Sequence, residues 1–478
     1  MLFNTLDFFY FFLIVTLVYF LLPHKFRWLH LLIASCYFYA AFIPVYILIL
    51  FFTIVIDYIA GIAIEKADIK YKKRMLLISI IANVGILFFF KYFNFFIDNI
   101  NTVSSLMGLK FDLPALSIIL PIGLSFHTFQ AMSYTIEVYR GTQKAERHFG
   151  IYALYVMFYP QLVAGPIERP QNVLHQFHEK HHFDIVNLWK GLRLMLWGLF
   201  KKVVIADRLS IFVDRVFESP EQHNSVVLIL GAVFFAIQIY CDFSGYSDMA
   251  IGAAKTMGFD LMTNFSRPYF ATNIKSFWDR WHISLSTWFR DYVYIPLGGN
   301  RVKVSRLYFN VAVVFILSGF WHGANWTFII WGALHTIYLL VYMFFTRKTK
   351  KSIETERNYL SLVFSWGITF VFVCFAWIFF RASSLSDAIE YILAIGNNFD
   401  MGVDFRISPQ GLKAGFGLLS YGIAIFASFV MFILEYKFSE RMSEDLVVYR
   451  DILLVAFLVL IIVFFGVFQK SSFIYFQF

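Results

Sequence analysis

Charged residues are scarce in this chain of 478 residues, where they make up 15% of the total, against roughly 25% in soluble domains. Hydrophobic residues make up 59%, and phenylalanine alone contributes 61. A soluble globule could not cover so much apolar surface, and disordered or collagen-like chains have the opposite composition. The composition excludes these classes and leaves an integral membrane protein.

Cysteine is scarce as well. Cys36, Cys241 and Cys374 lie in apolar surroundings and show no CxxC spacing. This pattern excludes a disulfide scaffold and supports no zinc site. The N-terminus lacks a basic region and a small-residue cleavage site, so we expect residues 6–22 to form a retained span rather than a signal peptide.

Long apolar runs dominate what is present. Alternating segments of about 10 residues would indicate a β-barrel, whereas these runs have helical length and predict an all-α polytopic membrane protein. The expected spans are 6–22, 28–43, 45–64, 75–97, 114–138, 226–254, 307–320, 326–345, 360–380, 412–434 and 451–468. Residues 150–166 are interrupted by Pro160 and Pro166 and predict a re-entrant or buried broken helix. We expect about 10–12 spans, plus one or more partial helices, in one domain of residues 1–478.

Basic residues predict the orientation in the membrane. The strongest basic loop holds Lys66, Lys70, Lys72, Lys73 and Arg74, and such loops lie on the cytoplasmic side. Counting spans from this loop places both termini outside the cytoplasm. The net charge of +9 has the same origin, because lysine and arginine are scattered between apolar spans. We therefore expect a lipid bilayer and no nucleic acid as a partner.

Tryptophan concentrates in one region. Six of the 11 tryptophans fall between residues 278 and 331. In SFWDRWHISLSTWFRDYVYIPLGGNR, helical spacing relates Trp278, Trp281, Leu285 and Trp288. This spacing predicts one amphipathic helix with an aromatic face, which is either an interfacial anchor or the border of a site.

Two histidines favour a site in this region. His282 lies in RWHIS, and His322 lies in SGFWHGANW between Gly319 and Gly323. Ionisable side chains at membrane depth are costly and usually functional, and histidine accepts a proton readily near neutral pH. A hydrogen-bonded core histidine is the alternative interpretation.

These segments resemble the membrane-bound O-acyltransferase (MBOAT) superfamily. The resemblance is carried by the two histidine motifs and by YPQLVAGPIERP (159–170), YCDFSGYSDMAIG (240–252), NFSRPY (264–269) and FIYFQF (473–478). The chain is most similar to the bacterial branch of alginate O-acetylation membrane proteins. The resemblance implies a ring of tilted helices around a thin central tunnel. Within it, 1–140 would form N-terminal helices, 150–346 the catalytic core, and 360–478 the C-terminal helices and aromatic tail.

The resemblance also implies an activity. His322 would be the essential histidine and His282 the second active-site histidine of an O-acyltransferase, with acetyl-CoA as donor and no bound cofactor or metal. The expected location is the bacterial cytoplasmic (inner) membrane. An outer-face SGNH-type acetyltransferase and polysaccharide assembly proteins would be partners. Acyl transfer to a hydroxyl needs a base and an oxyanion donor. We assign these roles to His322 and His282, and the reverse assignment stays open.

Other polar residues are candidates for binding the donor or lining the tunnel. Arginines on the predicted cytosolic side suit the phosphates of CoA, although the positive-inside rule also explains them. Asp242 belongs either to the tunnel or to a buried hydrogen-bond network. The candidates are Arg280, Arg290, Arg301, Asn325, Trp326, Asp242 and Gln161.

The C-terminal motif suggests a further role. The phenol of Tyr475 is a nucleophile that could accept an acetyl group and pass it on, as a similar tyrosine motif looks to do in related systems. An aromatic belt at the membrane interface is the alternative. His175 and His178 are one helical turn apart, but with one nearby acid, Glu179, we expect no metal there.

Three other functions compete with acetyl transfer. A D-alanylation-type enzyme would use an acyl carrier protein as donor. A lipid or glycan transporter would sustain flux without His322. A non-catalytic scaffold for polysaccharide export would tolerate the loss of either histidine, although both histidines in full motif context argue against it.

Overall fold

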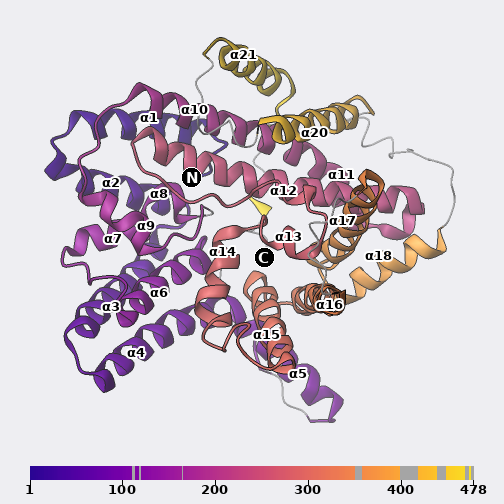
Figure 1. Cartoon of the computed structure of the whole chain (residues 1–478), viewed down its shortest axis with the longest axis horizontal. Coiled ribbons are helices and arrows are strands. Elements are labelled where there is room, and N and C mark those ends of the chain that lie inside the picture. The colour runs from indigo at the N-terminus through magenta and orange to yellow at the C-terminus, as the bar shows by residue number, and fades with distance from the viewer. Residues whose placement is uncertain are drawn as a thin grey trace. The chain divides into compact units, whose positions relative to one another are not determined.

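The computed structural model describes residues 1–109, 113–117, 120–163, 165–349, 358–398, 418–438, 448–468 and 473–474. In these residues every regular element is a helix (Figure 1), which confirms the all-α class. The chain forms two compact units, residues 1–195 with 246–262 and residues 196–245 with 263–478. Each unit is described by itself.

Unit 1 is built from the N-terminal helices. Within it, α3, α4 and α6 pack side by side (Figure 1). Its elements are α1 Leu6–Leu21, α2 His24–Ala40, η1 Pro44–Tyr46, α3 Ile47–Lys66, α4 Ile69–Leu87, η2 Phe88–Tyr92, α5 Phe93–Leu106, α6 Leu124–Arg140, α7 Phe149–Met157, α8 Tyr159–Leu162, α9 Pro170–Val173, η3 Leu174–His178 and most of α10 Ile185–Phe200.

Unit 2 contains the second half of the chain. Here α15 packs along α16, and α16 packs along α17. Its elements are η4 Lys201–Ala206, α11 Asp207–Glu218, η5 Pro220–Gln222, the first part of α12 Ser225–Thr256, η6 Pro268–Phe270, α13 Ile274–Trp278, α14 Ile283–Phe289, η7 Arg290–Tyr294, α15 Val304–His322, α16 Trp326–Thr349, α17 Tyr359–Arg381, α18 Leu385–Asn397, α20 Leu418–Phe438 and α21 Val448–Phe465.

Several helices are long and apolar enough to cross a membrane. Six meet this criterion among the described residues: 44–66, 69–106, 225–256, 304–322, 326–347 and 359–381. Leu6–Leu21 and Ile452–Phe465 are shorter apolar helices. Their large exposed side chains, such as Leu17 and Phe464, suit contact with lipid, where exposure of apolar surface has no cost. The protein is a multi-pass membrane protein, and the finer count of 10–12 spans stays a prediction.

The interrupted stretch 150–166 forms the expected broken helix. Phe158 separates α7 from α8, and Pro160 lies in the first turn of α8. Residues 150–163 are all buried, which confirms a buried broken helix. The span expected at 114–138 begins later, at Leu124, because Gly123 has a left-handed backbone (φ 75°) and stops the helix from extending toward Pro121.

The single amphipathic helix expected around Trp278–Trp288 is wrong. α13 ends at Trp278, α14 begins at Ile283, and His282 between them has φ 44°. A non-glycine residue in that conformation ends a right-handed helix. Trp281 and Trp288 are buried, so they are part of the protein core rather than an interfacial anchor.

Candidate active site

His282 and His322 lie together in unit 2. Their ring centroids are 6.4 Å apart with an interplanar angle of 48°. Their exposed fractions are 1% and 3%. The fold therefore brings two histidines that are 40 positions apart in the chain into one buried place, as the sequence predicted.

A fixed loop presents His282. The Ile283 N–H donates to the Asn264 carbonyl oxygen (2.9 Å), and the Ser284 hydroxyl donates to the Asn264 side-chain oxygen (2.9 Å). The Ser286 N–H donates to the His282 carbonyl oxygen (2.9 Å), which starts α14. Asn264, in the NFSRPY motif, thus holds the loop in the left-handed conformation that turns the His282 ring inward.

Aromatic rings surround both histidines. The His322 ring lies 5.0 Å from Trp321, 5.1 Å from Trp331 and 5.2 Å from Phe380, each steeply tilted against it. The His282 ring lies 4.6 Å from Phe243. Burial lowers the pKa of His282 to about 3, because the charged form loses its hydration. His282 is therefore neutral near pH 7, with one nitrogen that donates and one that accepts.

The turn after His322 is closely packed. A Cβ at Gly319 would overlap the Phe328 carbonyl oxygen, and a Cβ at Gly323 would overlap the Phe328 ring. Asn325 caps α16 by accepting from the Thr327 N–H (3.0 Å), and it donates to the Ser383 carbonyl oxygen (2.8 Å). The glycines therefore allow the close approach that the sequence suggested, and Asn325 supports the turn.

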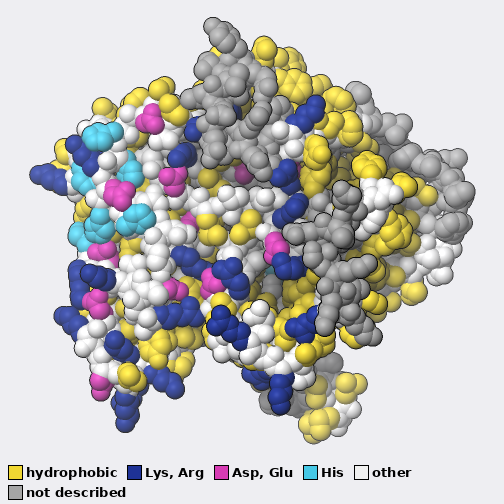
Figure 2. Space-filling view, viewed as in Figure 1, with side chains coloured by type: hydrophobic (Ala, Val, Ile, Leu, Met, Phe, Trp, Pro, Cys, Tyr) yellow, Lys and Arg dark blue, Asp and Glu magenta, His cyan; other side chains and the backbone are white. Residues whose placement is uncertain are grey.

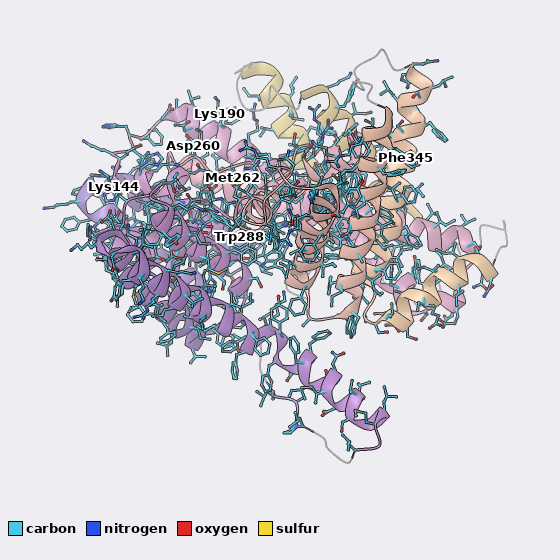
Figure 3. The ribbon with its side chains drawn as sticks, turned by 60° about the horizontal axis from the view of Figure 1, so that its bottom comes forward. Lys144, Lys190, Asp260, Met262, Trp288 and Phe345 are labelled. Carbon is cyan, nitrogen blue, oxygen red and sulfur yellow. The ribbon has the colours of Figure 1, made fainter. Side chains whose placement is uncertain are left out.

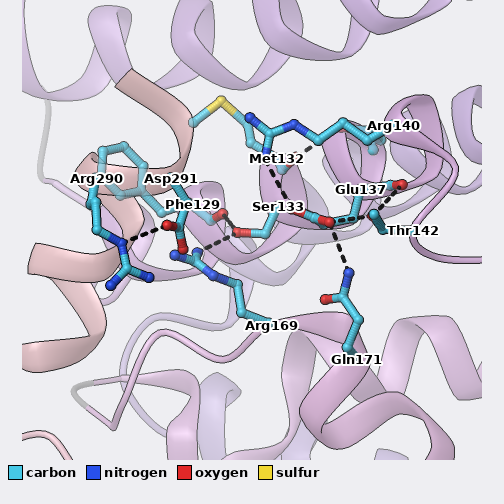
Figure 4. A network of polar contacts seen from close by, with 11 residues as sticks. Phe129, Met132, Ser133, Glu137, Arg140, Thr142, Arg169, Gln171, Arg290 and Asp291 are labelled. Carbon is cyan, nitrogen blue, oxygen red and sulfur yellow. Dashed lines mark hydrogen bonds and ion pairs between the residues drawn. The ribbon is translucent and has the colours of Figure 1, made fainter. Parts of the chain in front are cut away.

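Trp326 and the three candidate arginines lie toward the surface. Trp326 is 50% exposed. Arg290 and Arg301 are exposed, and Arg280 is half-buried. The Arg290 Nε pairs with Asp291 at 2.8 Å (Figure 4). Cations accessible from solvent suit an anionic ligand that arrives from solution.

Asp242 lies in a buried network of unit 2. One carboxylate oxygen lies 2.7 Å from the Lys202 Nζ, and the other accepts from the Ile474 N–H at 2.7 Å. Tyr475 follows Ile474 directly but lies outside the described residues. The chain up to Ile474 is therefore bound to the same segment that carries Phe243, a neighbour of His282.

Gln161 and Glu168 belong to unit 1. The buried Gln161 amide donates to the Tyr155 carbonyl oxygen (2.8 Å). Glu168 is fully buried and accepts from the Met262 N–H. Two residues earlier in the chain, the Asp260 N–H donates to the Gln176 side-chain oxygen (2.8 Å). Figure 3 labels Asp260 and Met262. Burial raises the pKa of Glu168 to about 7. Both side chains hold segments of unit 1 together.

A second polar cluster of unit 1 surrounds Glu137. This carboxylate accepts from Arg140 (3.3 Å), Gln171 (2.8 Å) and the Thr142 hydroxyl (Figure 4). Arg169 donates to the Ser133 hydroxyl (3.2 Å). These contacts connect the C-terminal half of α6 to α9 and to Arg169, the residue before α9.

The histidine-rich segment 175–182 pairs with acids instead of converging on one point. His178 lies 2.8 Å from Glu146, and His175 lies 3.9 Å from Glu179. Figure 2 shows histidines gathered beside acidic and basic side chains. Across the described residues, no group of three potential ligands suits a metal ion.

His335 is a buried histidine of unit 2 that the sequence motifs did not single out. This residue of α16 is fully buried, and its Nδ1 accepts from the Trp278 indole N–H (3.3 Å). Its ring lies 4.9 Å from the Trp331 ring, which also contacts the His322 ring. The spacing of His335 four residues after Trp331 was a signal, since such residues share one helix face.

Helices long and apolar enough to cross a membrane, together with a buried pair of histidines, define a polytopic membrane protein with a candidate active site. The sequence pattern of the MBOAT (membrane-bound O-acyltransferase) family matches residues 147–385. This range is half of the chain and includes both histidines. The chain belongs to this family and is an O-acyltransferase.

Relatives named for acyl transfer are similar over most of the chain. A peptidoglycan O-acetyltransferase of Helicobacter pylori is 39% identical over 76% of this chain and 72% of its own length. A protein of Pseudomonas aeruginosa named probable alginate O-acetylase AlgI is 37% identical over 89% and 81%. A teichoic acid D-alanyltransferase of Bacillus subtilis is 29% identical over 54% and 68%.

Proposed function

We propose that this enzyme moves an acetyl group from cytosolic acetyl-CoA across the membrane for the O-acetylation of an extracytoplasmic polysaccharide. The single observation that carries the proposal is the pairing of His282 with His322, 6.4 Å apart and buried among aromatic rings. The names of two relatives, for alginate and for peptidoglycan, support acetyl as the acyl group and a glycan as the final acceptor.

His322 acts as the general base in this proposal. Its ring takes the proton of the acceptor hydroxyl, and the oxygen attacks the thioester carbonyl carbon. As the new C–O bond forms and the C–S bond breaks, the proton passes to the departing thiolate, so charge and atoms balance. The rings of Trp321, Trp331 and Phe380 exclude water that would otherwise hydrolyse the thioester.

His282 stabilises the oxyanion. A neutral imidazole can donate one N–H to the oxygen that becomes negative in the tetrahedral intermediate. The low pKa of His282 keeps it in this form over the working pH range. The reverse assignment is the alternative, and it requires His282 to gain a proton in surroundings that disfavour its charge.

The surface arginines bind the donor in this scheme. Arg290 and Arg301 receive the phosphates of CoA, and Arg280 is the least exposed of the three. Asn325 and Trp326 support the turn that holds His322, while Asp242 lines the path of the acyl group.

Tyr475 relays the acetyl group to the outer face. Its phenol is the acceptor hydroxyl of the His322 step: the oxygen attacks the thioester carbonyl, the C–S bond breaks and CoA leaves as the thiol with the phenol proton. A hydroxyl of an SGNH-type partner then attacks the tyrosyl acetate, the tyrosine oxygen leaves and takes up that hydroxyl's proton, and the partner passes the acetyl group to the polysaccharide. The burial of Phe473 and Ile474 supports a C-terminal segment held within the protein. A Tyr475→Phe variant should retain acetyl-CoA binding and lose acetylation of the polysaccharide; normal acetylation would exclude the relay.

Orientation completes the proposal. The protein lies in the bacterial inner membrane with both termini outside, so that the donor enters from the cytosol and the acetyl group leaves on the opposite side. An acyl carrier protein as donor is the second candidate, which the similarity to a teichoic acid D-alanyltransferase favours. Transport of a lipid or glycan is a third possibility.

The deciding experiment supplies purified protein in liposomes with radiolabelled acetyl-CoA. We expect release of CoA by the wild type and a loss of about 10²–10⁴-fold in the rate for His322→Ala, with unchanged thermal unfolding. Equal rates would exclude His322 as the base. If folded wild type releases no CoA but accepts an acyl group from a carrier protein, the second candidate is correct; flux that survives His322→Ala would indicate a transporter.

A further inference from the structure

The end of α21 and the segment that follows it are bound to one region of unit 2 at three points. The Phe465 carbonyl oxygen accepts from Arg208, and the Val467 N–H donates to the Val203 carbonyl oxygen (2.9 Å). The Ile474 N–H donates to Asp242 (2.7 Å). Phe473 and Ile474 are buried, with exposed fractions of 1% and 3%. The segment is therefore held before and after residues 469–472.

The second of these partners, Val203, lies in an unusual turn. Val203 belongs to η4, a π-helical turn between α10 and α11. π-Helical turns change the hydrogen-bond register of a helix and occur often at functional sites. In η4, the Val203 carbonyl receives a bond from a residue 264 positions away in the chain, so this turn provides an attachment point for the C-terminal segment.

The same turn contributes a buried cation. The Lys202 Nζ lies 2.8 Å from Asp207 and 2.7 Å from Asp242, and the three side chains are each at most 4% exposed. Removing such charges from water costs several kcal/mol for each ion, which pairing offsets only with precise geometry. Ionisable groups buried in membrane proteins are accordingly functional by default.

A chain of contacts leads from this cluster to the candidate active site. The Phe473 ring lies 5.5 Å from the Phe243 ring, and the Phe243 ring lies 4.6 Å from the His282 ring. Phe243 directly follows Asp242 in α12. The carboxylate that binds the Ile474 N–H thus also fixes the place where Phe473 meets the neighbour of His282.

We propose that Lys202 is a positioning residue, which holds the Asp242 carboxylate so that it binds Ile474 and seats Phe473 against Phe243 beside His282. Without this cation, the buried Asp242 carboxylate loses the Lys202 ion pair that holds it. The Ile474 N–H then loses its acceptor, and Phe473 separates from Phe243. The inference rests on the proposed function only for the role of the adjacent histidine. Binding of the segment can be measured without any turnover.

The test measures how fast a cysteine at position 474 reacts. In a background where Cys36, Cys241 and Cys374 are replaced by alanine, Ile474→Cys should react slowly with a maleimide, because this position is buried. Adding Lys202→Met should raise the reaction rate at least about tenfold, since breaking a buried ion pair is costly. Lys202→Arg, which retains the cation, should restore slow labelling.

Glu435→Gln is the matched control. Glu435 is another buried carboxylate of unit 2, and it accepts from the Tyr240 hydroxyl (2.8 Å). Its replacement should leave labelling at position 474 unchanged. If Lys202→Met does not fold, the double variant Lys202→Met/Asp242→Leu removes both charges of the pair and the acceptor of the Ile474 N–H, and it should still label faster. Slow labelling in a folded Lys202→Met protein, or in the folded double variant, would overturn the proposal.

Failure of this inference and failure of the proposed function give different results. Adding His322→Ala to the Ile474→Cys protein should abolish acyl transfer and leave labelling slow. Lys202→Met with both histidines intact should instead lower kcat for transfer to the acceptor. KM for acetyl-CoA should stay constant, because Lys202 is buried away from solvent. A cluster that served stability alone would change thermal unfolding without faster labelling.

Discussion

His282, to which we assign the oxyanion, has an unfavourable backbone conformation. Its φ of 44° and ψ of 55° lie in the left-handed region, which costs a non-glycine residue roughly 1–2 kcal/mol. Such conformations persist at functional sites when the surroundings hold them. Here Asn264 holds the loop by accepting hydrogen bonds from the Ile283 N–H and the Ser284 hydroxyl. Asparagine is among the non-glycine residues that tolerate this conformation best. His282→Asn is therefore the replacement that removes the ring with least change in the backbone.

The titration of His282 predicts a dependence of stability on pH. Its pKa is about 3 in the folded protein, against 6.5 as its ordinary value. The unfolded chain therefore binds a proton at higher pH than the folded chain. The contribution to stability is complete above pH 6.5 and decreases by up to about 1.4 kcal/mol per pH unit as the pH falls toward 3. We expect the unfolding temperature of the wild type to fall more steeply between pH 6.5 and 4 than that of His282→Asn.

Thermal unfolding in detergent across this pH range provides the check. His282→Asn should still give a cooperative transition and should lack acyl transfer. If the unfolding temperatures of the two proteins change equally with pH, the pKa of the His282 imidazole does not differ between the folded and unfolded states, contrary to what its burial predicts.

At the scale of elements, two glycines set the contact between α15 and α16. A Cβ at Gly319 would overlap the Phe328 carbonyl oxygen, and a Cβ at Gly332 would overlap the Phe315 carbonyl oxygen. The helices therefore meet backbone to backbone, as small residues permit in membranes. This contact lies one turn from His322, so it determines where the histidine is held.

Alanine substitutions at these glycines test the contact. Gly319→Ala and Gly332→Ala should each destabilise the protein by about 1–3 kcal/mol through overpacking, and Gly319→Ala should also slow acyl transfer. Gly367→Ala in α17 is the control, because no described atom lies within 4 Å of its added Cβ; it should be neutral or stabilise by about 1 kcal/mol. Thermal unfolding and turnover of the three variants would be compared, and equal behaviour would refute the backbone contact.

The sequence predicted some elements well and others poorly, for physical reasons. Apolar runs bounded by charged loops place α3, α15, α16 and α17 to within a few residues, because hydropathy reports burial in lipid directly. The break at His282 was not visible, since helical spacing continues through it and tertiary contacts with Asn264 impose the turn. The pairing of the two histidines came from resemblance to a family, whereas their aromatic surroundings and His335 required the fold.

At the scale of the whole molecule, the orientation in the membrane is open to a direct test. The loop of residues 66–74 should lie in the cytoplasm. In a cysteine-free background, Lys70→Cys should react with a membrane-impermeant maleimide only after the cells are permeabilised. A cysteine at position 4, before α1, should react in intact cells with an accessible periplasm; the converse pattern would reverse the predicted orientation.

The contact between α15 and α16 also bears on how the enzyme responds to its lipids. α15 has 19 residues, a length of about 28 Å, close to the thickness of about 30 Å of a bilayer core. A thinner or thicker bilayer is accommodated mainly by tilt, and helices joined through their backbones tilt as one body. His322 would keep its distance from Trp331 in membranes of different thickness, so the proposed site would be insulated from changes in the acyl-chain length of the surrounding lipids.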